Sequence, residues 1–238
     1  DIKQPQQQSQ QSQGRQGWGI EYDSHESYHE MEAMSFKTQG TVKTADGKEI
    51  NFNLELSMQR EYFIEKNVSI RAGDAVKIDP LVINFENNTV QLTDKKYEFD
   101  LDSNGSKDKI SFVQPGSGFL ALDLNGDGIV NNGQELFGPK TGNGFAELAK
   151  YDEDGNGWID ESDSVFSRLR LWTKDALGKD LLSTLAEKNI GAIYLNNIDT
   201  LFHLKNADNK ENGEIKSSGI FLKENGTAGS IMQVDLTV

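Results

Sequence analysis

Three loops of the chain place acidic and amide side chains at alternating positions, a spacing that lets their oxygen atoms surround one hard cation. Ca²⁺ takes about six to eight oxygen ligands, and a glycine at loop position 6 allows the sharp bend that brings them together. In the most complete loop, position 7 is expected to contribute its backbone carbonyl and position 12 is an aspartate. Its expected ligands are Asp152, Asp154, Asn156, Trp158 (through its carbonyl), Asp160 and Asp163. This pattern predicts a calcium site.

The second loop follows a short apolar run and repeats the pattern with one extra residue. Its closing acid, Glu135, stands at position 13 instead of 12, and Gly133 offers the backbone freedom to absorb the insertion. The expected ligands are Asp123, Asn125, Asp127, Ile129 (through its carbonyl), Asn131 and Glu135. We expect calcium here as well, in a loop that a strand enters.

The third loop begins in the same way but has no acid at position 12, so water would have to complete the ligand shell. Its candidate ligands are Asp100, Asp102, Asn104, Ser106 (through its carbonyl) and Asp108. The alternative is a β-turn held by hydrogen bonds from Asp and Asn side chains to the backbone. Magnesium competes for such sites, but it keeps its waters in a small octahedral shell, so ligand-rich loops favour calcium. We expect two calcium ions, with the third loop as an additional candidate.

The composition agrees with cation binding and argues against several other functions. The 238 residues include 24 Lys and Arg against 38 Asp and Glu, a net charge of −14. Nucleic acid and anionic membrane surfaces both need a basic face, so neither is an expected partner. The absence of Cys excludes disulfides and thiol nucleophiles, and no apolar run is long enough to insert into a membrane as a helix. Such a chain suits a secreted bacterial protein in an extracellular or cell-surface location rich in calcium, although cytoplasmic proteins share this composition.

Three regions are expected along the chain. Residues 1–16 are rich in Gln and Ser, which bury too little apolar area to offset the entropy of ordering, and they predict a disordered tail. Residues 17–78 predict a β-hairpin, because apolar and polar residues alternate over residues 50–58 after an Asp-Gly turn at residues 45–48. Residues 79–238 predict a calcium-binding module with short strands and with helices at 143–151, 163–171 and 181–188. This mixture predicts an α+β fold with the hairpin packed on the module.

The order of these motifs is typical of one family. The run GFLALDLNGDGIVNNGQELFG is followed by NGFAELAKYDEDGNGWIDESDSVFSRLRLW and then by NIGAIYL. In this order the chain from Asp79 to Val238 resembles the calcium-dependent self-processing module of iron-regulated RTX proteins, and the loop from Asp152 resembles EF-hand and dockerin loops. The resemblance implies that calcium triggers cleavage of the Asp79–Pro80 bond. It also implies that the resulting Asp79 anhydride is opened by water or by a lysine amine.

The residues at this bond allow such chemistry without a separate nucleophile. An oxygen of the Asp79 carboxyl can close a five-membered ring on the carbonyl carbon of the same residue, with the high effective concentration of an intramolecular attack. The nitrogen of Pro80 is more basic once released than an ordinary amide nitrogen. Residues 84–89, where the family has a further calcium loop, hold too few carboxylates for one. An ordinary extended junction before proline therefore stays open as the alternative.

A different chemistry is suggested by His25, Glu26 and His29, which match the H-E-x-x-H motif of zinc proteases. The motif works on a helix, where both histidines share one face. Here the neighbouring residues lead into a strand pattern, and residues four apart on a strand are separated by about 13 Å, too far to share one ion. We therefore expect a calcium-binding module with a structural or interaction role and an unknown protein partner. Self-processing is the alternative, and a zinc protease is a remote one.

Overall fold

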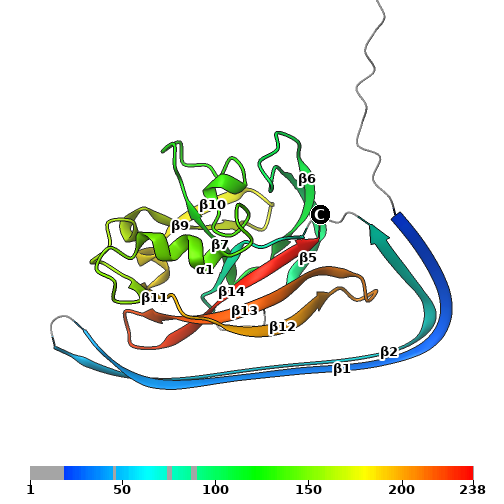
Figure 1. The fold of residues 1–238 in the computed structure, drawn as a ribbon, viewed down its shortest axis with the longest axis horizontal. Coiled ribbons are helices and arrows are strands. Elements are labelled where there is room, and N and C mark those ends of the chain that lie inside the picture. The colour runs from blue at the N-terminus through cyan, green and yellow to red at the C-terminus, as the bar shows by residue number, and fades with distance from the viewer. Residues whose placement is uncertain (1–18, 45–46, 74–76, 87–89, 238) are drawn as a thin grey trace, which may run out of the picture.

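The structure is a computed structural model that describes residues 19–44, 47–73, 77–86 and 90–237, with the backbone alone for residues 19–29, 63–73 and 77. The tail expected at residues 1–16 lies outside this part of the chain. Strands dominate the described residues and form a curled sheet that resembles half a barrel (Figure 1). The expected α+β class is therefore wrong, since the described chain is mostly β with a single short α-helix. That helix is too short to cross a membrane, and no other described helix could do so.

A long antiparallel hairpin opens the described chain, formed by β1 (Gly19–Lys43) and β2 (Glu49–Gly73). The two strands lie on either side of the expected turn, where Val42 pairs with Ile50. Because side chains alternate along a strand, Met34 and Met58 share the face that packs against the rest of the protein, and Met58 is buried there. Figure 1 shows the hairpin as a curved pair of strands running along β12. The expected hairpin is thus present and packed on the module.

The large sheet has ten antiparallel strands, most of which follow the order β10-β9-β7-β4-β14-β13-β11-β8. Outside this path, β12 pairs with β13 and β3 pairs with β14. The strands are β3 (Lys77–Ile78), β4 (Leu81–Asn84), β7 (Ser117–Leu122), β8 (Trp158–Ile159), β9 (Leu169–Lys174), β10 (Asp180–Thr184), β11 (Ile190–Tyr194), β12 (Ile198–Lys205), β13 (Glu211–Lys223) and β14 (Ala228–Thr237). A separate hairpin of β5 (Leu92–Phe99) and β6 (Asp108–Val113) packs its apolar residues against this sheet.

The core lies on both faces of the large sheet. Strand β4 is buried along its whole length; Val82 belongs to one apolar cluster, and Leu81 and Ile83, on either side of it, belong to a second. The first cluster is aromatic: the ring centroid of Phe112 lies 4.9 Å from those of Phe119 and Trp172, nearly perpendicular to both rings. The second cluster packs the sheet against the single helix. Strands buried on both faces lack the polar alternation of a surface strand, which makes them hard to recognise in a sequence.

One of the three expected helices forms. Helix α1 (Gly144–Leu148) begins after Asn143, whose side chain accepts a hydrogen bond from the Ala146 amide, and it continues as a 3₁₀ turn, η2 (Ala149–Tyr151). The helices expected at residues 163–171 and 181–188 are wrong. Those residues form η3 (Phe166–Arg168), β9, β10 and η4 (Ala186–Lys188). A short apolar run fits a strand or a helix equally well, and here pairing of β9 with β7 and β10 decides for the strand.

Candidate functional site

In the loop with the most complete set of expected calcium ligands, the closing carboxylate is buried and accepts hydrogen bonds from the backbone. Asp163 is 2% exposed and accepts hydrogen bonds from the amides of Glu153 (2.7 Å) and Asp160 (3.0 Å). One carboxylate oxygen each from Asp152, Asp154 and Asp163 lie within 4.8 Å of one another. The fold therefore gathers the acids at loop positions 1, 3 and 12 around one small volume.

The first half of this loop is shaped by side-chain to backbone hydrogen bonds. The two oxygens of Asp152 accept from the amides of Gly155 (2.9 Å) and Gly157 (3.0 Å). Both glycines have positive φ, which lets the chain wrap around the Asp152 carboxylate. The carbonyl oxygen of the Asn156 side chain accepts from the Trp158 amide (2.7 Å). All these contacts turn side-chain oxygens toward the inside of the loop.

The flanks of this loop differ from those of an EF-hand. The chain enters from η2, but it leaves through η3 and then strand β9, so the helix expected on the far side is missing. Strand β8, inside the loop, pairs with β11, and the ring of Trp158 packs 4.6 Å from that of Tyr194. The Leu195 amide also donates to the Gly157 carbonyl (3.0 Å). The large sheet, and not a second helix, holds the loop in place.

The second loop closes in the same way as the first. Glu135 is 5% exposed and accepts hydrogen bonds from the amides of Leu124 (3.0 Å) and Asn131 (2.7 Å), which are loop positions 2 and 9. Asp163 accepts from the same two positions of its own loop. The extra residue is accommodated in a 3₁₀ turn, η1 (Gly133–Glu135). Gly133 packs closely on the Leu101 carbonyl, and a Cβ at this position would lie 1.8 Å from the carbonyl oxygen.

The opening of the second loop also repeats the first. Asp123 accepts from the amides of Gly126 (2.7 Å) and Gly128 (2.8 Å). The Ile129 amide donates to Asp127, and this hydrogen bond is the main cause that lowers the pKa of the Asp127 carboxyl. The remaining polar side chains of the loop hydrogen-bond to one another: Asn125, Asp127 and Asn131. Two loops of different flanking structure thus share one internal geometry.

The third loop connects β5 to β6 and is more open. It contains four of the expected ligands, and the fifth, Asp108, is the first residue of β6; the four are Asp100, Asp102, Asn104 and Ser106. Asp100 accepts from the amides of Asn104 (3.0 Å) and Gly105 (3.1 Å), as in an ordinary Asp-headed turn. Burial raises the pKa of the Asp108 carboxyl, and the nearby charges of Asp102 and Asp100 raise it further. The crowded carboxylates fit a cation, while the hydrogen bonds fit the turn equally well.

The Asp79–Pro80 bond is buried between β3 and β4. The Asp79 residue is 3% exposed, and its Oδ2 atom accepts hydrogen bonds from Nζ of Lys216 (2.9 Å) and Nε2 of Gln233 (3.2 Å). Its Oδ1 atom is buried and has no hydrogen-bond partner among the described residues. The contact with Asp79 is the largest influence that raises the pKa of Lys216, so the ammonium form persists beside this carboxyl.

The residues shortly after Glu135, Phe137 and Gly138, pack closely around the Asp79–Pro80 bond, and we call this segment the cradle. The Leu81 amide donates to the Phe137 carbonyl (2.9 Å), and a Cβ at Gly138 would lie 1.8 Å from the carbonyl oxygen of Asp79. On the opposite side, the Val234 amide donates to the Pro80 carbonyl (3.0 Å). The second loop and the Asp79–Pro80 junction are therefore joined by a few residues of packed chain.

Two polar neighbours of Asp79 could not be found by reasoning from the sequence. Lys216 and Gln233 lie 137 and 154 residues away along the chain and reach Asp79 from β13 and β14. Neither belongs to a local motif, so no pattern in the sequence marks them. Only the pairing of β14 with both β13 and β4 brings them to this carboxyl.

The H-E-x-x-H motif falls on strand β1, where His25 pairs with Asn67 and His29 pairs with Phe63. The side chains of His25, Glu26 and His29 lie outside the described part of the chain. A strand spaces residues four apart by about 13 Å, so this backbone does not form the helical arrangement that zinc proteases use.

Two comparisons with known proteins bear on these sites. A family model described as the SPM domain matches residues 81–237, beginning directly after Pro80. The iron-regulated protein FrpA of Neisseria meningitidis serogroup C is 27% identical over 174 residues. The match covers 68% of this chain but only 15% of the length of that relative.

Proposed function

The chain belongs to the SPM domain family and is related to an iron-regulated, FrpA-like protein of the RTX type. On that premise we propose that residues 79–238 form a calcium-binding module whose bound Ca²⁺ orders the fold in a structural or interaction role. The site that we assign to this function comprises the loops at residues 123–135 and 152–163, with the loop at residues 100–108 as a third candidate.

The buried closing acids support this proposal most strongly. Glu135 and Asp163 are 5% and 2% exposed, and each accepts two backbone amides of its own loop. These hydrogen bonds fix the position of each carboxylate, and each carboxylate oxygen still has a further lone pair that could bind a cation. Calcium, when bound, would supply the positive charge that these gathered carboxylates lack.

The positions of the loops explain why a bound cation would order the fold. The loop from Asp123 follows β7, a central strand of the sheet, and leads into the cradle around Asp79. The loop from Asp152 connects η2 to η3 and β9. Without a cation, the carboxylates of each loop repel one another at short range. We expect the strands that flank the loops to loosen as a result.

Calcium titration of the full chain tests this function. Native mass spectrometry and calorimetry in chelator and then in millimolar calcium should show two or three bound ions and a higher melting temperature. Asp152→Asn should lose one ion, whereas the matched control Asp175→Asn should lose none, because Asp175 heads an exposed turn outside the three loops. A chain that binds no calcium, or whose melting temperature is the same in chelator, would overturn the proposal.

A second candidate function is suggested by the buried carboxyl of Asp79. We propose that the chain can cleave its own Asp79–Pro80 bond, because Oδ1 of Asp79 has no hydrogen-bond partner among the described residues while Lys216 and Gln233 hold Oδ2. Oδ1 attacks the carbonyl carbon of its own residue, the bond to the Pro80 nitrogen breaks, and that nitrogen takes up a proton. Water then opens the cyclic anhydride and leaves two carboxyl groups on Asp79.

Denaturing mass spectrometry at neutral pH tests the cleavage separately from calcium binding. Incubation in calcium should produce fragments that end at Asp79 and begin at Pro80. Asp79→Ala should abolish them, and Lys216→Gln should slow their appearance while calcium still binds. An undivided chain after prolonged incubation with saturating calcium would remove this candidate and leave the calcium-binding function intact.

A further inference from the structure

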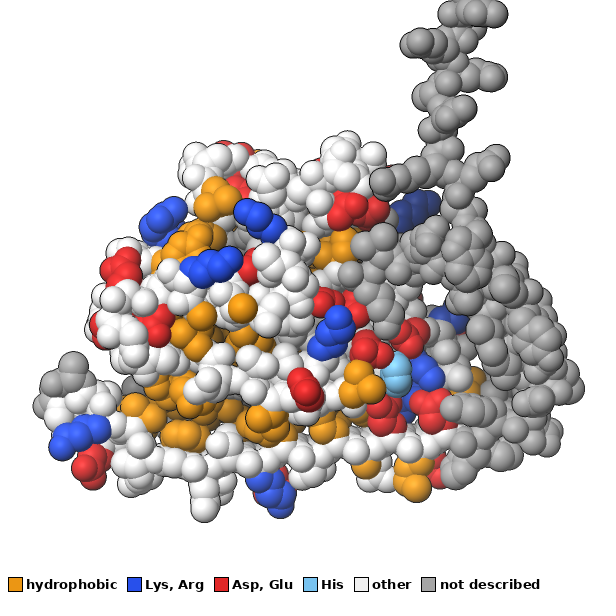
Figure 2. All heavy atoms as spheres, viewed as in Figure 1, with side chains coloured by type: hydrophobic (Ala, Val, Ile, Leu, Met, Phe, Trp, Pro, Cys, Tyr) orange, Lys and Arg blue, Asp and Glu red, His pale blue; other side chains and the backbone are white. Residues whose placement is uncertain are grey.

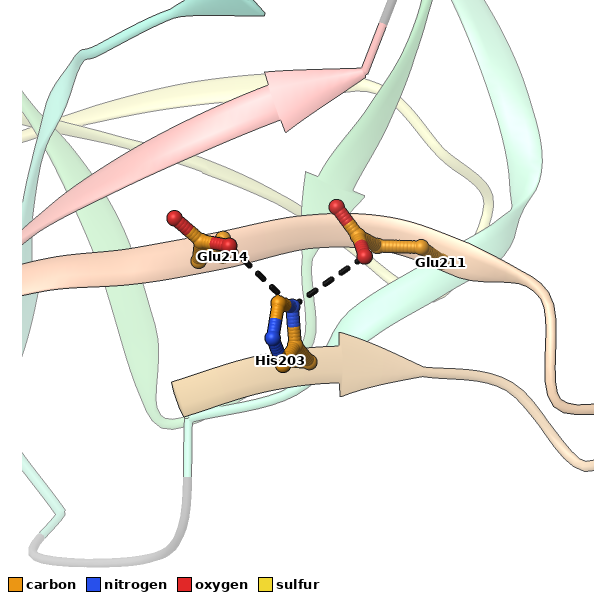
Figure 3. Close-up of side chains that lie close together, drawn as sticks. All are labelled: His203, Glu211 and Glu214. Atoms are coloured by element: carbon orange, nitrogen blue, oxygen red, sulfur yellow. Dashed lines mark ion pairs between the residues drawn. The ribbon is translucent and has the colours of Figure 1, made fainter. Parts of the chain in front are cut away.

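We propose that His203, Glu211 and Glu214 form a binding site for a first-row transition-metal cation such as Zn²⁺, separate from the three Asp-rich loops. One ligand atom of each residue lies within 4.8 Å of the other two. His203 projects from β12, and both glutamates project toward its ring from β13 (Figure 3). Nothing in the calcium pattern involves these residues, which lie beyond the last of the three loops.

A bulge in β13 brings the two glutamates to the same face. His203 pairs with Glu214, and Leu204 pairs with Gly213, but Lys205 pairs with Glu211, so the register skips Asn212. In a regular strand, residues three apart point to opposite faces; the extra residue of a bulge reverses that relation. Glu211 is thereby aimed at the same imidazole as Glu214.

The distances between the three side chains match those between ligands of one metal ion. Nδ1 of His203 lies 3.1 Å from Oε2 of Glu211 and 3.1 Å from Oε2 of Glu214. Ligands bound at about 2.1 Å, with angles between about 90° and 109° at the metal, are separated by about 2.9–3.5 Å. Two nitrogen–oxygen separations within this range, measured from one ring nitrogen, suit two edges of a single coordination shell.

The orientation of the ring nitrogen favours a cation over a shared proton. Nδ1 of His203 is buried, and although both oxygens are near enough, neither lies in the direction in which a proton on Nδ1 could form a hydrogen bond. A proton is confined to the N–H direction and serves one acceptor well. A cation at bonding distance from Nδ1 could instead contact both oxygens at once.

The surroundings add negative charge next to the imidazole. Oε1 of Glu32 accepts from the His203 backbone amide (3.4 Å), and Oε2 of Glu32 is buried without a hydrogen-bond partner among the described residues. The cationic side chains of Arg60 and Lys205 on this face both pair with Glu30. Figure 2 shows the pale blue histidine colour at the surface with red acidic side chains on several sides.

The donor set points to a transition metal and not to calcium. Imidazole nitrogen suits zinc and its neighbours, whereas Ca²⁺ takes oxygen ligands and usually more of them than this site offers. The side chains of His203, Glu211 and Glu214 are 35%, 31% and 11% exposed, so an ion and a completing water can enter from solvent. A bound ion would link the end of the β12–β13 hairpin to the region of Glu32 on β1.

Zinc titration of the calcium-saturated full chain tests the site, because millimolar calcium keeps the Asp-rich loops occupied. Calorimetry should show one Zn²⁺ bound. His203→Gln and Glu214→Gln should each raise the dissociation constant for Zn²⁺ at least tenfold. The matched control His25→Gln/His29→Gln should bind zinc as the unaltered chain does. Zinc binding that is absent from the unaltered chain, or that survives His203→Gln but not the control substitutions, would overturn the proposal.

A measurement on the unaltered chain avoids dependence on the folding of the variants. Mn²⁺, a paramagnetic ion that accepts the same donors, should broaden the ring resonances of His203 in NMR spectra far more than those of His25 and His29. Equal broadening of all three histidines, or an unaffected His203 ring, would show that no ion binds here. Failure of calcium to bind would appear in the calcium titration itself, so the two proposals fail independently.

Discussion

Substitution of Glu135 by Gln separates the structural role of this carboxylate from its proposed role as a calcium ligand. The carboxylate accepts the amides of Leu124 and Asn131 in a site that is 5% exposed. Glutamine retains one acceptor oxygen, so its buried NH₂ group faces the second amide and the hydrogen bond to that amide is lost, at a cost of about 1–3 kcal/mol. For a chain of this size each kcal/mol lowers the melting temperature by about 2–4 °C. In chelator we therefore expect a loss of about 2–12 °C.

Calcium should enlarge this deficit, because the variant has also lost the charged group that closes the second loop. Thermal unfolding followed by circular dichroism, in chelator and in millimolar calcium, gives both quantities, and calorimetry should show one ion bound at least tenfold more weakly. Glu161→Gln is the matched control, since it makes the same change at an exposed acid that is not a candidate ligand. If Glu135→Gln gained as much stability from calcium as the unaltered chain, Glu135 would not be a ligand.

Three further changes probe other parts of the molecule. Burial holds the pKa of Asp108 above its ordinary value of 3.8, so ionisation of Asp108 opposes folding at higher pH and this opposition disappears as the carboxyl is protonated. Because Asp108 is partly exposed to solvent, which screens its charge, Asp108→Asn should raise the melting temperature in chelator at neutral pH by only about 1–3 °C. This gain should shrink as the pH falls. A lower melting temperature at neutral pH would contradict an unfavourable charge at Asp108. Gly138→Ala places a Cβ 1.8 Å from the Asp79 carbonyl oxygen and should lose about 2–4 kcal/mol in urea unfolding. The control is Gly47→Ala, because Gly47 also has a positive φ but has no atom near the position of a Cβ; this variant should lose about 1 kcal/mol. Equal losses in the two variants would show that the residues around Asp79 shift to make room for the Cβ at residue 138. Phe112→Ala empties the aromatic cluster and should lose about 3–5 kcal/mol, and a loss below 1 kcal/mol would mean that this ring does not anchor the core.

The hairpin and the helix at Asn143 could be predicted because their determinants are local. The β1–β2 hairpin follows from alternating residues around a turn, and α1 follows from a capping residue before an apolar run. The helices expected at residues 163–171 and 181–188 failed for a physical reason. Leu169 and Leu171 are equally able to line a helix or a buried strand, and the partner strand β7, some 50 residues earlier in the chain, made the choice.

The internal geometry of the loops was contained in the sequence. Asp and Glu side chains accept backbone amides of their own loop, so each of these hydrogen bonds joins residues within one short stretch of sequence. The sequence likewise pointed to Asp79–Pro80 as a junction. The proposed cleavage would involve only adjacent atoms of Asp79 and Pro80, so its bond changes need no distant nucleophile.

The environment of each site was decided by the tertiary structure alone. Lys216 and Gln233 reach Asp79 only because β14 pairs with both β13 and β4, and Glu211 faces His203 only because β13 skips one residue in its register. Neither relation leaves a periodic or local trace in the sequence. Strand pairing and bulges depend on the packing of the whole sheet, and a single residue of register reverses the face to which a side chain points.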